Sequence, residues 1–165
     1  MKRTATWLLL LLTAGAVWHM VHYYPLLPET VGSHYGASGE PDGWSSKQTF
    51  VALYAVLVAL IGGMFFVLAV FIPRIPDSLI NIPHRDYWLA PERRRQSLAT
   101  VSVTLLCLAS ATVALIIGAM HLSFLVNLGE RSGLGAEFWW LMGAYGLLTL
   151  GSVVWMMARF RKPFP

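Results

Sequence analysis

Four long apolar runs constrain the fold of this chain more than any other feature. They span residues 6–24, 50–72, 98–128 and 137–159. Each is close to or longer than the roughly 20 residues that a helix needs to cross a hydrocarbon core of about 30 Å. Because lipid offers no partner for unpaired backbone groups, we expect each run to form a helix. The third run is long enough to tilt or to project beyond the lipid.

Composition agrees with this assignment. Only 12% of the 165 residues are charged, whereas about 25% is usual for soluble domains, and the mean hydropathy is +0.60. We therefore predict an all-α membrane protein in which four transmembrane helices form one up-down bundle. This single transmembrane domain covers residues 1–165, with connecting loops at 25–49 and 73–97.

The distribution of cations predicts the orientation. Ten of the twelve lysines and arginines fall on one side of the predicted helices: Lys2, Arg3, Arg74, Arg85, Arg93, Arg94, Arg95, Arg159, Arg161 and Lys162. By the positive-inside rule, both termini and the 73–97 loop are cytoplasmic and the 25–49 loop is extracytoplasmic. This topology and contact with anionic lipid explain the net charge of +4, so we expect no nucleic-acid partner.

The first run also has the form of a secretory signal, because Met-Lys-Arg precedes it and Ala14 and Ala16 stand where a cleavage site would lie. Its apolar character continues through Val17, Trp18 and Met20. We therefore expect it to persist as a transmembrane helix.

Three histidines lie within the predicted helices. His19 and His22 share a face near the outer end of the first helix. His121 lies about 10 Å below the outer end of the third, a depth similar to that of His19, so these side chains are expected to be within reach of each other. Ionisable groups inside membranes are costly and often functional. With His34 on the loop above, they are the candidate ligands for zinc or copper.

Other interpretations of these histidines stay open. Imidazoles equally suit proton handling. Alternatively, His19 and His22 are interfacial, His121 forms a hydrogen bond between helices, and His34 is an ordinary loop residue. No HExxH or CxxC motif, nucleophile elbow or phosphate-binding glycine loop occurs in the sequence, so the motifs leave enzymatic activity undecided.

The 25–49 loop is polar and glycine-rich, and longer than a simple connection requires. Pro25 and Pro28 are expected to end the first helix. A turn is predicted at Pro41-Asp42-Gly43, and Ser45 or Ser46 is expected to cap the second helix. Long loops often carry function. Its candidate ligand-binding residues are His34, Gly39, Glu40, Asp42, Gly43 and Lys47.

The stretch LPETVGSHYGASGEPDGWSSK combines Leu-Pro, a His followed by an aromatic residue, Gly-x-x-Asp-Gly and Ser-Lys before a helix. It resembles the domain of unknown function that opens the bacterial Sdp toxin-immunity proteins, a family of multi-pass membrane proteins. The matching positions are Pro28, His34, Gly39, Asp42, Gly43 and Lys47. The resemblance implies a multi-pass protein of the bacterial inner membrane with a role in immunity to, or signalling about, a secreted peptide.

Three functional hypotheses follow. In the first, the outward loop senses or neutralises an external ligand such as an antimicrobial peptide. In the second, the chain is a metal-dependent membrane enzyme or a metal-handling protein that uses His19, His22, His121 and His34, with zinc or copper as the cofactor. In the third, it is an accessory subunit that binds another membrane protein. The lipid bilayer is a partner in all three.

Overall fold

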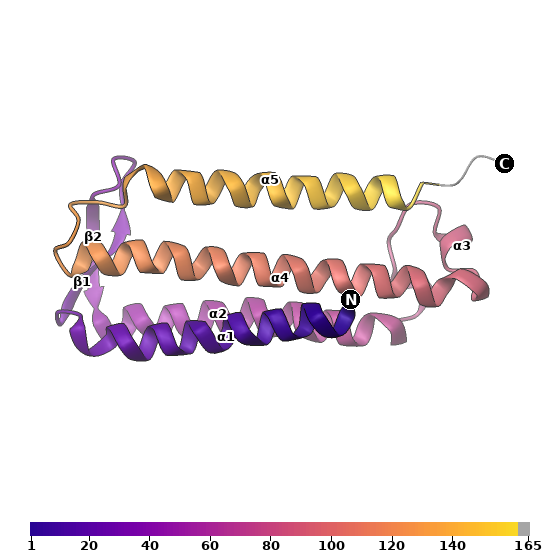
Figure 1. The fold of residues 1–165 in the computed structure, drawn as a ribbon, viewed down its shortest axis with the longest axis horizontal. Helices are drawn as coiled ribbons and strands as arrows, with labels where there is room; N and C mark the ends of the chain where they lie inside the picture. Colours follow the sequence, from indigo (N-terminus) through magenta and orange to yellow (C-terminus); the bar gives the residue numbers. More distant parts are fainter. Residues whose placement is uncertain (162–165) are drawn as a thin grey trace.

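The computed structural model describes residues 1–161, which are mostly helical (Figure 1). Four helices are long and apolar enough to cross a membrane, as the sequence predicts: α1 (Lys2–Tyr23), α2 (Lys47–Phe71), α4 (Pro91–Asn127) and α5 (Gly135–Arg159). These properties indicate a multi-pass membrane protein. Lys162, one of the cations used to predict the orientation, lies outside the described residues.

Local sequence explains where the helices begin and end. Ser46 caps α2, where its side-chain oxygen accepts a hydrogen bond of 3.2 Å from the Thr49 N–H. After α1 a short 3-10 turn (Tyr24–Leu26) contains Pro25. Pro91 begins α4 upstream of the predicted start, because a proline in the first turn needs no backbone N–H. The 37 residues of α4 extend for about 55 Å, which exceeds the hydrocarbon thickness.

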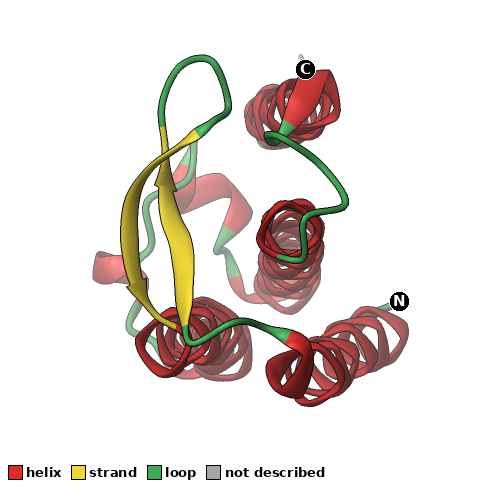
Figure 2. Cartoon of the chain, turned by 90° about the vertical axis from the view of Figure 1, so that its left-hand side faces the viewer, coloured by secondary structure: helices red, strands yellow, loops and turns green. Residues whose placement is uncertain are grey.

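The long helices lie side by side (Figure 1). Seen along their length, α4 lies between α5 and the pair formed by α1 and α2 (Figure 2). The main apolar core is built where α1, α2 and α4 meet, and its buried members include Leu9, Ala16, Met20, Phe50, Tyr54, Val58, Leu106, Ala109, Val113 and Phe124. In contrast, α5 packs on α4 and has no buried residue.

A β-hairpin covers one end of the helices, in a loop for which the sequence predicts no strands (Figures 1 and 2). Strand β1 (Thr30–Tyr35) pairs antiparallel with β2 (Pro41–Ser46), with Thr30 opposite Ser46 and Tyr35 opposite Pro41. We call this end of the molecule the hairpin end.

The predicted position of the turn is wrong. Asp42 and Gly43 lie inside β2, and the chain reverses over residues 36–40. There the Gly36 N–H donates to the Glu40 carbonyl at 3.0 Å, and the Gly39 N–H donates to the Gly36 carbonyl at 2.9 Å. Gly39 supplies the positive φ of +84° that this turn requires. Pro41 is tolerated in the strand because the sheet has only two strands, so one edge of each is unpaired.

The opposite end carries the connection between α2 and α4, which contains two 3-10 turns (Ile72–Arg74 and Asp77–Leu79) and the short helix α3 (Arg85–Trp88). A second apolar cluster forms there around Ile80, Trp88, Leu98 and Phe160. The Trp88 indole N–H donates to the Phe160 carbonyl at 2.8 Å, which ties the connection to the end of α5. We call this the α3 end.

Candidate functional site at the hairpin end

An amide side chain of α4 forms the first attachment of the hairpin to this helix. Asn127, the last residue of α4, accepts a hydrogen bond of 2.6 Å from the Gly32 N–H through Oδ1. Its Nδ2 donates to the Gly32 carbonyl at 3.0 Å and to the Ser123 carbonyl at 2.9 Å. Asn127 thus pairs with both backbone groups of Gly32 as a neighbouring strand would, which explains how a two-stranded hairpin holds one position on the helices.

Tyr35 adds a second attachment to α4. Its hydroxyl lies 2.6 Å from the Ser123 Oγ and 3.1 Å from the Gly32 carbonyl, and it accepts a hydrogen bond of 3.2 Å from Asn127 Nδ2. Burial raises the pKa of the Tyr35 hydroxyl above its ordinary value, although the hydrogen bonds with Ser123 and Asn127 act in the opposite direction. Tyr35 is therefore a neutral structural group at physiological pH.

The tip of the hairpin docks on the connection between α4 and α5. The Leu134 N–H donates to the Gly39 carbonyl at 2.9 Å. This approach requires Gly133, because a Cβ at that position would lie 2.8 Å from the Gly39 carbonyl oxygen. The hairpin therefore spans from α2 to the beginning of α5.

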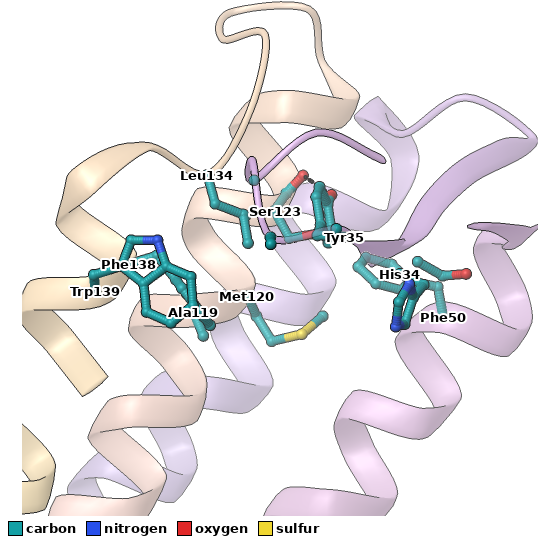
Figure 3. Close-up of a pocket in the computed structure, with 13 residues that line it drawn as sticks. His34, Tyr35, Phe50, Ala119, Met120, Ser123, Leu134, Phe138 and Trp139 are labelled. Atoms are coloured by element: carbon teal, nitrogen blue, oxygen red, sulfur yellow. Dashed lines mark hydrogen bonds between the residues drawn. The ribbon is translucent and has the colours of Figure 1, made fainter. Parts of the chain in front are cut away.

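Beneath this span lies a cavity of about 490 Å³, within the size range of small-molecule sites. Figure 3 shows Phe138 and Trp139 of α5 on one side and Phe50 and His34 on the other, with Met120 of α4 between them. Ala119, Ser123 and the hairpin-tip residues 36, 37 and 39 also line it. The lining is mainly apolar, and we call this space the hairpin cavity.

Acidic side chains lie in strand β2 and in a polar depression beside the hairpin tip. Asp42 pairs with the His34 imidazole across the hairpin. A polar depression next to the hairpin tip contains Glu40 and Glu130, neither of which pairs with a cation among residues 1–161. Arg131 lies in the same depression and pairs with Glu137 at 2.8 Å.

Lys47, at the first position of α2, ties that helix to the residue just before β1. The Lys47 ammonium lies 2.9 Å from a Glu29 carboxylate oxygen, and the backbone N–H of Lys47 donates to the Glu29 carbonyl at 3.0 Å. The hydrogen bond and charge of Lys47 hold the pKa of the Glu29 carboxyl below its ordinary value, with a smaller contribution from Gln48. Lys47 thus acts within the hairpin attachment and does not line the cavity.

The expected meeting of His19 and His121 is confirmed. His19 Nε2 lies 3.3 Å from His121 Nδ1, and His19 Nδ1 lies 3.4 Å from the Tyr54 hydroxyl. With Tyr54 as donor, His19 carries its proton on Nε2 and donates it to His121, which leaves an N–H on His121 Nε2. Phe124 stacks on the His19 ring with centroids 5.0 Å apart. Three polar side chains from α1, α2 and α4 therefore form one continuous hydrogen-bonded chain within the membrane-spanning region.

The other two candidate histidines are placed elsewhere. His22 is exposed and stacks on Trp18 of α1, with centroids 5.2 Å apart. His34 pairs with Asp42 in the hairpin and does not join the His19 pair. Over residues 1–161, no three His, Cys, Asp or Glu side chains are grouped as metal ligands. Zinc or copper binding therefore stays a prediction, with two of its four named histidines in contact.

Sequence reasoning overlooked the residues that build the site. Tyr35, Ser123 and Asn127 attach the hairpin, and Tyr54 extends the histidine pair. One signal for Asn127 and Tyr54 is present in the sequence, since each is a polar side chain in or at the end of an apolar run. The pairing of Asn127 with Gly32 has no such signal, because 95 residues separate them.

Comparison with known proteins gives one match. A family model described as a domain of unknown function (DUF1648) matches residues 8–58. The matched region contains most of α1, the whole hairpin and the first half of α2, and so includes His34, Gly39, Asp42, Gly43 and Lys47. No curated protein and no solved structure matches the chain. The relation to the Sdp toxin-immunity proteins is therefore a hypothesis.

Proposed function

We propose that this protein senses or neutralises an external amphipathic ligand, of the antimicrobial-peptide type, at its hairpin end. The observation that carries the proposal is the hairpin cavity, an apolar space of about 490 Å³ roofed by a polar hairpin. Apolar side chains of a ligand would enter between Met120, Phe138 and Trp139. Burial of aromatic and aliphatic groups in such a space is the usual source of affinity at a binding site.

Charge favours a cationic ligand. Five carboxylates belong to the hairpin end (Glu29, Glu40, Asp42, Glu130 and Glu137), against only two lysines or arginines, Lys47 and Arg131. Both cations are already paired, with Glu29 and Glu137. Glu40 and Glu130 thus remain available to a ligand beside the cavity. Complementary charge of this kind steers encounter and selects partners more than it raises affinity.

We also propose a location and an orientation for the protein in the membrane. The protein belongs to the bacterial inner membrane, with its helices in up-down order, both termini cytoplasmic and the hairpin outside. Support comes from the ten cations on the side opposite the hairpin. In this orientation the hairpin cavity opens at the outer leaflet, where a secreted peptide arrives.

Survival of cells under peptide challenge tests this function. A strain that lacks the gene should be sensitised to at least one secreted cationic peptide, and the wild-type chain should restore resistance. Glu40→Gln, Glu130→Gln and Asp42→Ala should each restore it poorly, and His34→Ala should resemble Asp42→Ala because the two side chains pair. Asp86→Asn is the matched control, since Asp86 is exposed at the α3 end.

Two results would contradict the proposal. One is full resistance in all four hairpin-end variants while the deletion strain is sensitive, which would remove the hairpin from the activity. The other is a loss of resistance in Asp86→Asn equal to that in the hairpin-end variants, which would indicate a general effect of charge. Expression of each variant in the membrane is measured in parallel by immunoblot.

A metal-binding function is a second candidate, and the contact between His19 and His121 favours it. Their nitrogens are 3.3 Å apart, close to the separation of about 3.3 Å between two ligands of tetrahedral zinc. Remaining ligands would come from water or the bound substrate. Elemental analysis of purified protein tests this function: stoichiometric zinc or copper that is lost in His19→Ala supports it, and its absence at neutral pH rejects it.

A further inference from the structure

A second cavity, at the α3 end, lies where the first turn of α1, the end of α2 and the beginning of α4 meet. Its volume is about 390 Å³. Lys2, Arg94 and Arg95 line one part of it, and Leu98, Ala99 and Ser102 line the part further along α4. The cavity thus has a cationic region and a mostly apolar region, and we call it the basic cleft.

Two of the three cations in the basic cleft have no acidic partner among residues 1–161: Lys2 and Arg95. The Lys2 ammonium donates one hydrogen bond, of 3.0 Å, to the Ala69 carbonyl near the end of α2, so two of its three protons stay available. Arg95 is exposed. The cleft therefore presents two uncompensated positive charges to a ligand.

Arg94 has a different role. Its guanidinium pairs with Asp77 at 2.9 Å and donates to the Pro73 and Ile75 carbonyls, both at 3.1 Å. These contacts fix the connection after α2 as a wall of the cleft. Arg94 is therefore a structural residue whose charge is already balanced.

The hydroxyl of Ser102, at the far part of the cleft, lacks a hydrogen-bond partner within the described part of the chain. The Ser102 residue is completely buried. Four other hydroxyl residues of α4 (Thr100, Thr104, Ser110 and Thr112) donate to the carbonyl one turn earlier, as hydroxyls in membrane helices commonly do. An unpartnered buried hydroxyl is unfavourable, and Ser102 lines the cleft, so a ligand that enters the cleft would supply its missing partner.

We infer that the basic cleft binds an anionic glycerophospholipid. Lys2 and Arg95 contact its phosphate, and the Ser102 hydroxyl donates a hydrogen bond to an ester carbonyl of its acyl chains. Ser102 lies two helical turns, about 10 Å, beyond Arg95 along α4, and Leu98 and Ala99 lie between them. A lipid would place its phosphate at the cationic region and an ester group, which follows the glycerol, toward the Ser102 hydroxyl, whereas free phosphate would satisfy only the cationic region.

Native mass spectrometry of the delipidated full-length protein in detergent tests the cationic region. Phosphatidylglycerol should bind with about tenfold higher affinity than phosphatidylcholine, whose choline cation is repelled by the cleft. Lys2→Gln and Arg95→Gln should each weaken phosphatidylglycerol binding about fivefold. Arg3→Gln is the matched control and should stay within about twofold of wild type, because Arg3 adjoins Lys2 but does not line the cleft.

A second comparison isolates Ser102. Ester-linked phosphatidylglycerol should bind wild type about fivefold more tightly than its ether-linked analogue, which has no carbonyl to accept a hydrogen bond. Ser102→Ala should bind the two lipids equally. Ser110→Ala, whose hydroxyl bonds the Leu106 carbonyl within α4, should keep the wild-type preference and controls for the loss of a buried hydroxyl.

Four results would overturn the inference: equal binding of phosphatidylglycerol and phosphatidylcholine, an equal loss of phosphatidylglycerol binding in Arg3→Gln, the same ester preference in Ser102→Ala as in wild type, or displacement of the lipid by inorganic phosphate. Inorganic phosphate at millimolar concentration should not displace the lipid. Displacement would identify the cleft as a site for free anions instead. Each variant must retain the monodisperse elution of wild type, and Thr100→Ala provides a further folded reference on the same helix.

Discussion

Asn127 shows how much of this structure depends on single polar side chains. It lies at the end of a long apolar helix and forms hydrogen bonds with Gly32, Tyr35 and Ser123. Isolated two-stranded hairpins have little stability of their own. The Asn127 amide, together with Tyr35 and the contact between Gly39 and Leu134, thus holds the hairpin in place over the hairpin cavity.

Replacing Asn127 should release the hairpin without unfolding the helices. Asn127→Ala leaves both backbone groups of Gly32 without their partner on α4, at a cost of about 1–3 kcal/mol. We expect amide exchange at residues 30–35 to be roughly tenfold faster or more, measured by hydrogen exchange and mass spectrometry. Asn81→Ala, the same substitution at the α3 end, should leave this exchange unchanged, and equal rates in Asn127→Ala and wild type would refute the role of Asn127.

Prediction of individual contacts from the sequence succeeded where the depth of two side chains below the helix ends decides whether they meet. His19 and His121 have similar depths in the sequence pattern, and their rings meet. It did not anticipate the pairing of His34 with Asp42, because the strand pairing that brings these side chains together depends on register. Pro41-Asp42-Gly43 is a favourable turn sequence, but Gly36 and Gly39 provide an alternative turn that also allows Tyr35 to reach Ser123.

At the scale of elements, the hairpin and α2 form one continuous unit. Ser46 ends β2 and caps α2, and the next residue, Lys47, pairs with Glu29 just before β1. Helix boundaries here were predictable because apolar length, prolines and capping serines are local signals. The strands were not, because TVGSHY and PDGWSS contain two glycines and a proline between them, residues that are depleted in strands.

The pairing of Glu29 with Lys47 gives this unit a pH dependence. The pKa of Glu29 is lower in the folded protein than its ordinary value. The pair therefore stabilises the hairpin at pH values above this ordinary pKa. This contribution is lost as the pH falls through the folded pKa. Thermal melting followed from pH 7 to about pH 3.5 should show a larger decrease for wild type than for Glu29→Gln. Parallel curves for the two proteins would contradict the proposed contribution.

At the scale of the whole molecule, α4 is the element that organises all others. It packs against α1 and α2 on one side and α5 on the other (Figure 2). Its two ends carry different chemistry: Ser123 and Asn127 hold the hairpin, whereas Arg94 and Ser102 belong to the basic cleft. The number and positions of the spans followed from hydropathy, but which helices pack together did not, since all four have apolar faces suited to lipid as well as protein.

The peripheral position of α5 creates the hairpin cavity. No α5 residue is buried among the described residues, and Tyr145 holds the helix to α4 through a hydrogen bond of 2.8 Å with Thr112. At the hairpin end the space beside α4 is therefore closed by side chains and by the hairpin, rather than by direct helix packing. A ligand in this space would contact β1, α2, α4 and α5 at once.

Binding of a synthetic amphipathic Lys-Leu peptide to the purified protein in nanodiscs tests whether the hairpin cavity is the ligand site. Wild type should bind saturably, and Ala119→Trp, which places an indole in the hairpin cavity, should weaken binding at least about tenfold. Ala114→Trp, the same change at an exposed position of α4 outside the cavity, should bind as wild type does. Equal affinity of Ala119→Trp and wild type would contradict the assignment of the hairpin cavity as the ligand site.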